Sequence, residues 1–148
     1  MIAKAQSALE YLLIIALVLG LIIPITYLFF RYGSQSNEQI VDSQINQIGN
    51  TIVDTAEIVY YSGEGAKIIV ELKIPENIDS VDILEDRELV FTRSSEIGEN
   101  QMVFFSSVGI PIKSDAASLL YLASSGLKKV RIRAVDPGTG LEVRIEKT

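Results

Sequence analysis

The sequence predicts an α+β protein in which a long N-terminal helix is followed by a small antiparallel β-sheet head domain. Three observations support this fold class. Residues 11–30 contain no charged residue and only Gly20, Pro24 and Thr26 as non-apolar interruptions. Residues 37–61 carry apolar side chains at spacings of three and four, which is the period of a helix. From residue 66 onward the period changes to two, which is the period of a strand.

The apolar segment 11–30 is the first element. At about 1.5 Å per residue it gives roughly 30 Å of helix, which matches the hydrocarbon core of a bilayer. A core helix in so small a soluble domain is seldom apolar on every side. Lys4 precedes the segment and Arg31 follows it, so the basic residues leave its orientation open. The segment is therefore predicted to span a membrane once, and Gly20 and Pro24 are tolerated there.

Residues 37–61 are predicted to form an amphipathic helix that ends at the turn "SGEG", residues 62–65. Polar residues separate its apolar positions. With the apolar segment it would make one helical rod of about 55 residues, on the order of 80 Å long. The apolar positions are Ile40, Val41, Ile45, Ile48, Ile52, Val53, Ala56 and Val59.

Short strands follow. In "KIIVELKI", residues 67–74, Ile68, Val70, Leu72 and Ile74 share one face. "SVDIL" and "ELVFT" are predicted to pair across the acidic turn "EDR". "QMVFFSS", residues 101–107, is apolar on both faces, which is typical of a strand buried on both sides.

The last hairpin has the clearest pattern in the head. "LKKVRIRAV" and "LEVRIEK" flank the turn "DPGTG". Opposite charges are expected to face one another on the outer side of the ladder, and each such exposed pair contributes a few tenths of a kcal/mol at most. Residues 106–127 fit either a short helix or a strand with a loop. The inward set is Val130, Ile132, Ala134, Leu141, Val143 and Ile145, and the outward set is Arg131, Arg133, Glu142, Arg144 and Glu146.

Composition excludes several kinds of chemistry. The chain has no Cys and no His, so disulfides, thiolate catalysis, Cys/His zinc sites and Ser-His-Asp chemistry are ruled out within it. The formal net charge of −6, with basic residues that alternate with apolar ones, argues against nucleic-acid binding. The acidic run 79–88 lacks the spacing of a calcium loop. We expect no cofactor, no metal and no enzymatic activity.

The beginning of the chain carries a motif. In "KAQSALEYLLIIALVLGLIIP", Lys4 and Ala5 precede Gln6, and Glu10 is the fifth residue counted from Gln6. Tyr11 and the long apolar segment follow. This pattern resembles the class III signal of type IV pilins in the archaeal form, over residues 4 to about 30. The family pattern most often has Ser at the third mature position, whereas here Ser7 is second and Ala8 is third.

The resemblance implies a processing site at Lys4, Ala5 and Gln6, where a membrane-embedded prepilin peptidase removes the leader 1–5 on the cytoplasmic side. A carboxylate at the margin of a bilayer is costly and normally marks a function or a partner. Glu10 of one subunit is then expected to meet the new amine of Gln6 in another, with Tyr11 beside it. The filament core is expected to include Leu12, Leu13, Ile14, Leu17, Leu21, Pro24, Tyr27 and Leu28.

The expected function is that of a structural subunit. Residues 6–61 would polymerise as the N-terminal helix, with the membrane or filament core at 11–30 and the amphipathic half at 37–61, and residues 66–148 would form an extracellular head. The expected partners are further copies of the chain, the prepilin peptidase, a pilus assembly platform and, before assembly, the membrane. Attachment to surfaces is the expected purpose. The alternatives are a minor pilin or pseudopilin of a secretion or uptake machine, and a membrane-anchored binding module that never polymerises.

Overall fold

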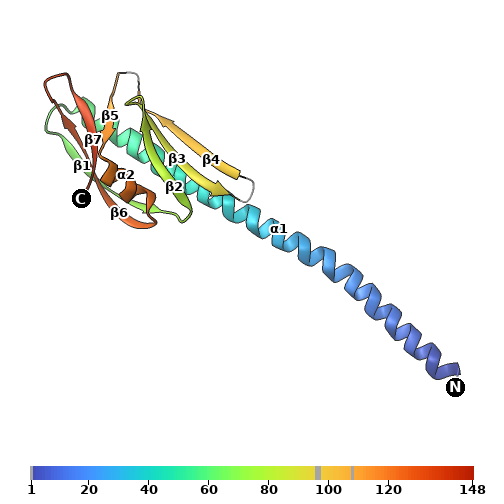
Figure 1. Ribbon diagram of the computed structural model, residues 1–148. Helices are drawn as coiled ribbons and strands as arrows, with labels where there is room; N and C mark the ends of the chain where they lie inside the picture. Colours follow the sequence, from blue (N-terminus) through green and yellow to red (C-terminus); the bar gives the residue numbers. More distant parts are fainter. Residues whose placement is uncertain (1, 96–97, 108) are drawn as a thin grey trace. The chain divides into compact units, whose positions relative to one another are not determined.

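The computed structural model describes residues 2–95, 98–107 and 109–148, and for residues 2–8 and 34–36 it describes the backbone alone. The chain divides into two units, one up to Ile40 and one from Val41 to Thr148. A long helix followed by β-strands confirms the predicted α+β class (Figure 1). The elements are α1 (Ile2–Tyr61), β1 (Lys67–Ile74), β2 (Ile78–Leu84), β3 (Glu88–Ser95), β4 (Gly98–Phe105), β5 (Ile112–Ser114), α2 (Ala116–Ala123), β6 (Gly126–Val135) and β7 (Glu142–Lys147).

Helix α1 ends where glycines follow it. The amide of Ser62 still donates to the carbonyl of Ile58 at 3.0 Å, and the amide of Gly63 donates to that of Tyr60. Gly63 and Gly65 then adopt φ values of 88° and 82°, which glycine reaches without steric cost. The predicted stop at "SGEG" is confirmed.

A four-stranded sheet has the strand order β1-β6-β7-β5. The predicted hairpin is confirmed as β6 and β7, which pair antiparallel with Ile132 opposite Ile145. The segment that the sequence left open forms the short strand β5 and the helix α2. Strand β5 pairs with β7 in parallel, so this sheet is not purely antiparallel.

A three-stranded antiparallel sheet has the order β2-β3-β4, as Figure 1 shows. The acidic turn between β2 and β3 places Glu85 and Asp86 in left-handed backbone conformations. In β4, Met102 and Phe104 point inward, but the side chain of Phe105 is 65% exposed. The prediction that this strand is buried on both sides was wrong, because β4 is an edge strand and no described element covers its outer face.

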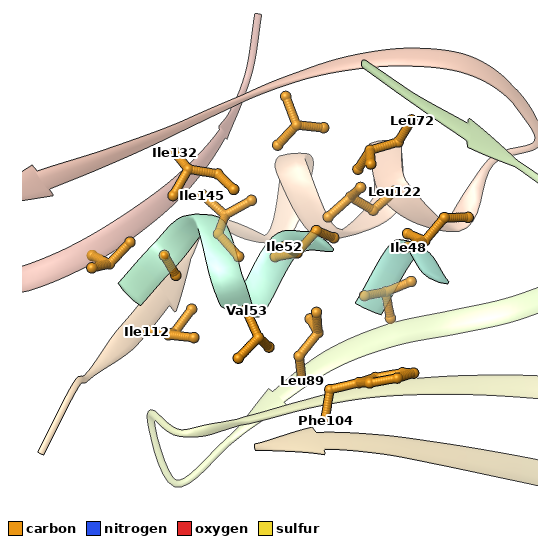
Figure 2. Packing of buried hydrophobic residues seen from close by; sticks show 14 of the residues in the cluster. Ile48, Ile52, Val53, Leu72, Leu89, Phe104, Ile112, Leu122, Ile132 and Ile145 are labelled. Atoms are coloured by element: carbon orange, nitrogen blue, oxygen red, sulfur yellow. The ribbon is translucent and has the colours of Figure 1, made fainter. Parts of the chain in front are cut away.

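The core of the second unit forms around the C-terminal part of α1, which confirms its amphipathic character. Figure 2 shows Ile52 and Val53 between residues of the two sheets. Ile132 and Ile145 of the four-stranded sheet lie on one side, and Leu89 and Phe104 of the three-stranded sheet lie on the other. The buried apolar side chains of the helix are Ile45, Ile48, Ile52, Val53, Ala56 and Val59, whereas the predicted Ile40 is exposed.

Candidate assembly surface on the apolar helix

Among the described residues of its own unit, the apolar part of α1 has no protein partner. Its large apolar side chains are exposed to fractions between 38% at Ile15 and 77% at Phe29. By length and composition it is the one described helix that can cross a membrane, and no part of its most apolar window is buried. A helix of a soluble domain buries at least one stripe. This surface therefore needs lipid or other protein chains around it.

The structure places the predicted assembly residues on this surface. Glu10 and Tyr11 are exposed at the start of the apolar segment. All eight predicted core residues are exposed on α1, namely Leu12, Leu13, Ile14, Leu17, Leu21, Pro24, Tyr27 and Leu28. The backbone at Lys4, Ala5 and Gln6 is helical, and their side chains lie outside the described part of the structure. Their role in processing is predicted from the sequence motif alone.

Two small or rigid residues interrupt the apolar surface. Pro24 lies inside α1, and the helix continues through it. A methyl group built on Gly20 would meet nothing within 4 Å. The isolated chain therefore imposes no steric requirement for glycine at position 20.

Polar contacts attach the three-stranded sheet to α1 within the second unit. The side chain of Arg93, on β3, is only 3% exposed, and its Nη2 lies 2.9 Å from Oδ1 of Asp42 on α1. The two atoms form an ion pair without hydrogen-bond alignment, and Nε of Arg93 has no hydrogen-bond partner among the described residues. Ser107 donates hydrogen bonds from its amide and its hydroxyl to Glu57. A buried guanidinium is costly to leave unpaired, so Asp42 and Arg93 fix how β3 docks on the helix.

A second buried charge lies at the edge of the four-stranded sheet. The side chain of Glu142 was predicted to point outward into solvent, but it is only 4% exposed. Nζ of Lys113 lies 2.9 Å from its Oε2, and Nε of Arg144 lies 2.7 Å from its Oε1. Hydrogen bonds from Lys113 and then Arg144 lower the pKa of Glu142, and the bond to Glu142 raises the pKa of Lys113. The sequence pattern missed this cluster, because Lys113 comes from the three-residue strand β5.

A hollow with a volume of about 480 Å³ lies beside the start of α2. Asp115 and Ser118 line it. The Ser118 hydroxyl accepts a hydrogen bond from the amide of Lys147, and a hydrogen bond from Ser118 lowers the pKa of Asp115. These groups hold α2 against β7. Among the described residues, no three carboxylates converge into a metal site.

Comparison of the chain with protein-family models, with curated proteins and with solved structures finds no match.

Proposed function

We propose that this chain is the structural subunit of an extracellular type IV pilus-like filament. The observation that carries the proposal is the apolar part of α1, whose side chains are exposed on all sides while the C-terminal part of the same helix is packed in a folded head. Such a surface is compatible with two successive environments. Lipid surrounds it before assembly, and the same segment of other subunits surrounds it afterwards.

Assembly of such a helix gains little from the hydrophobic effect, because lipid tails are as apolar as leucine side chains. Specificity must then come from packing and from polar groups. In the proposed mechanism, cleavage between Ala5 and Gln6 by the prepilin peptidase creates a new amine. Glu10 of a neighbouring subunit pairs with that amine, and the low dielectric of the helix bundle strengthens the attraction. An assembly platform extracts each subunit, and the head is carried outside the cell for adhesion.

Co-expression with a prepilin peptidase tests the proposal. Intact-mass measurement of sheared surface material should give a chain that has lost Met1–Ala5 and begins at Gln6, and electron microscopy should show fibres. Retention of the leader would contradict the proposed processing. Fibre abundance separates a main subunit from a minor pilin, which would be present in few copies.

A matched pair of variants separates the proposal from a membrane-anchored module that never polymerises. Glu10→Gln removes the carboxylate of the apolar helix, and Glu64→Gln makes the same change in the exposed turn after α1. The proposal expects fibres from Glu64→Gln and few or none from Glu10→Gln. Equal fibre yields from both variants would contradict the proposed role of Glu10 in assembly.

A further inference from the structure

The two sheets of the head carry opposite charge. The four strands β1, β5, β6 and β7 contain nine basic residues and three carboxylates, a net charge of +6. The segment from Ile78 to Phe105, which forms the three-stranded sheet, contains seven acidic and two basic residues, a net charge of −5. The whole chain has a net charge of −6. The charge is therefore separated between sheets rather than mixed over the surface.

On the outer face of the four-stranded sheet, the strand register places four basic residues in one row. Lys67 is opposite Arg133, Arg133 is opposite Arg144, and Arg144 is opposite Lys113. Three carboxylates on this face pair with some of its basic residues. We call this surface the basic face; its charged residues are Lys67, Glu71, Lys73, Lys113, Lys129, Arg131, Arg133, Glu142, Arg144 and Glu146, and it also carries the exposed Ile69 and Leu127.

The basic face has a surplus of positive charge that its own carboxylates do not neutralise. Seven basic residues face three carboxylates. Lys67 and Lys73 are exposed and form no ion pair with any described residue. An exposed apolar side chain, Ile69, follows Lys67 by two positions on the same face. The face therefore presents unneutralised cations around apolar contact area.

The outer face of the three-stranded sheet is the complement. Asp82, Glu88 and Glu99 point to this side, and no described Lys or Arg of the strands accompanies them, since Arg93 points inward to Asp42. Exposed apolar side chains lie between the carboxylates. We call this surface the acidic face; it consists of Asp79, Asp82, Leu84, Glu88, Glu99, Val103 and Phe105.

The two faces point away from the α1 segment that lies between the sheets in Figure 2. They are different surfaces of one head. Contact between unlike surfaces of identical chains is heterologous, and it propagates as an open chain when the rotation between copies does not close a ring. A C2 dimer would instead bring like charges together at either face.

We propose that the acidic face of one head docks on the basic face of the head of a second copy. The occupant is another copy of this chain because each face carries the charge that the other lacks, with exposed apolar side chains in both. Complementary charge mainly sets orientation and partner choice, and the apolar centre excludes water. This inference rests on the proposed filament, in which heads of successive subunits lie beside one another.

Cysteine cross-linking in the full-length chain tests the contact directly. The chain has no Cys, so a disulfide between two chains that each carry one introduced cysteine must join those introduced residues. Ile69→Cys lies on the basic face and Val103→Cys on the acidic face, and both positions are exposed. Cells that express the two variants together should give a disulfide-linked dimer, and cells with either variant alone should not. Leu120→Cys, on the exposed side of α2, replaces either partner as the control.

Charge exchange provides the second test. Lys67→Glu with Lys73→Glu reverses the basic face, and Glu88→Lys with Glu99→Lys reverses the acidic face, without breaking an ion pair that the described residues form. Each double reversal should reduce cross-linking by about tenfold or more, because several attractive pairs become repulsive. The chain that carries all four substitutions should regain the cross-link, because the charges of the two faces are then exchanged. Glu64→Lys with Glu76→Lys makes an equal change of charge off both faces and should have no effect.

The outcomes separate the inference from the proposed function. Fibres of processed subunits without the Ile69→Cys to Val103→Cys cross-link would overturn the docking of heads and leave the filament intact. If the cross-link forms in membranes but the chain is neither processed nor assembled into fibres, the docking of heads is supported and the proposed filament is contradicted. If reversal of the basic face reduces cross-linking and the chain with all four substitutions does not restore it, the basic face binds a different anionic surface and the inference is wrong.

Discussion

Gly49 is the position at which one added methyl group should most disturb the head. It is buried in α1 against β4, and a methyl group there would lie 2.4 Å from two ring carbons of Phe104 and 2.5 Å from a third. Ordinary contact begins at 3.4 Å, so the ring would have to retreat by about 1 Å. The ring is not free to do so, because it is buried and packs edge-on against Phe91 with centroids 5.9 Å apart.

The expected size of the Gly49→Ala effect follows from two opposing terms. Overpacking a filled core costs about 1–3 kcal/mol. Alanine in a helix interior recovers about 1 kcal/mol relative to glycine. We therefore expect a net destabilisation of about 1 kcal/mol, which lowers the unfolding midpoint of a domain of this size by about 4 °C.

Thermal unfolding of the purified chain in detergent micelles, followed by near-ultraviolet circular dichroism, measures this effect. Gly33→Ala is the matched control, since Gly33 is on the same helix and a methyl group there meets nothing within 4 Å. The double variant Gly49→Ala with Phe104→Leu should lose less stability than the sum of the single variants, by about 1 kcal/mol. Additive effects, or a Gly49→Ala chain as stable as the original, would refute the packing argument.

The other predictions concern charged groups. Glu10→Gln should reduce fibre yield in sheared surface material about tenfold or more while the mass of the processed chain shows normal leader removal, because only the pairing with the new amine is lost. Asp42→Asn should destabilise the head by about 2 kcal/mol in denaturant unfolding, because the buried Arg93 loses its counter-charge; Arg93→Met in the same chain should recover part of that loss. The pKa of Glu142 is lowered from its ordinary 4.5, so its stabilising contribution is present above pH 4.5 and is lost as the pH falls through its folded pKa. Glu142→Gln should therefore flatten the acid side of a stability profile against pH, and an unchanged slope would contradict this role.

Much of the fold could be predicted because long periodic segments determine it. A segment of twenty uncharged and mostly apolar residues, followed by helical spacing and then by alternation, leaves little freedom in the assignment of α1, β1, β6 and β7. The short elements have too few residues for their sequence period to distinguish a helix from a strand. Strand β5 has three residues, and α2 has eight that fit a strand as well as a helix, so their assignment depended on tertiary contacts.

Alternation also misjudged one buried charge and did not identify a second. Glu142 occupies an outward position of β7, yet Lys113 and Arg144 cover and neutralise it. Arg93 lies one residue beyond the predicted strand "ELVFT", so the alternation assigned it to neither face, and its pairing with Asp42 on a distant part of the chain was not visible in the sequence. Period identifies the face on which a side chain lies, whereas burial of a charge depends on which segments fold over that face.

Pro24 has a consequence for hydrogen bonding along the apolar segment of α1. Proline has no amide hydrogen, so the carbonyl four residues earlier, that of Gly20, receives no helical hydrogen bond. Residue 20 has no side chain to shield that carbonyl, and in the proposed membrane-embedded subunit lipid would offer it no donor. Gly20 and Pro24 together thus leave one carbonyl without a helical donor, and a hydrogen-bond donor from a neighbouring helix would be most favourable at this site. Since the isolated chain has room for a methyl group at position 20, any loss of fibres in Gly20→Ala would report the neighbour and not the chain itself.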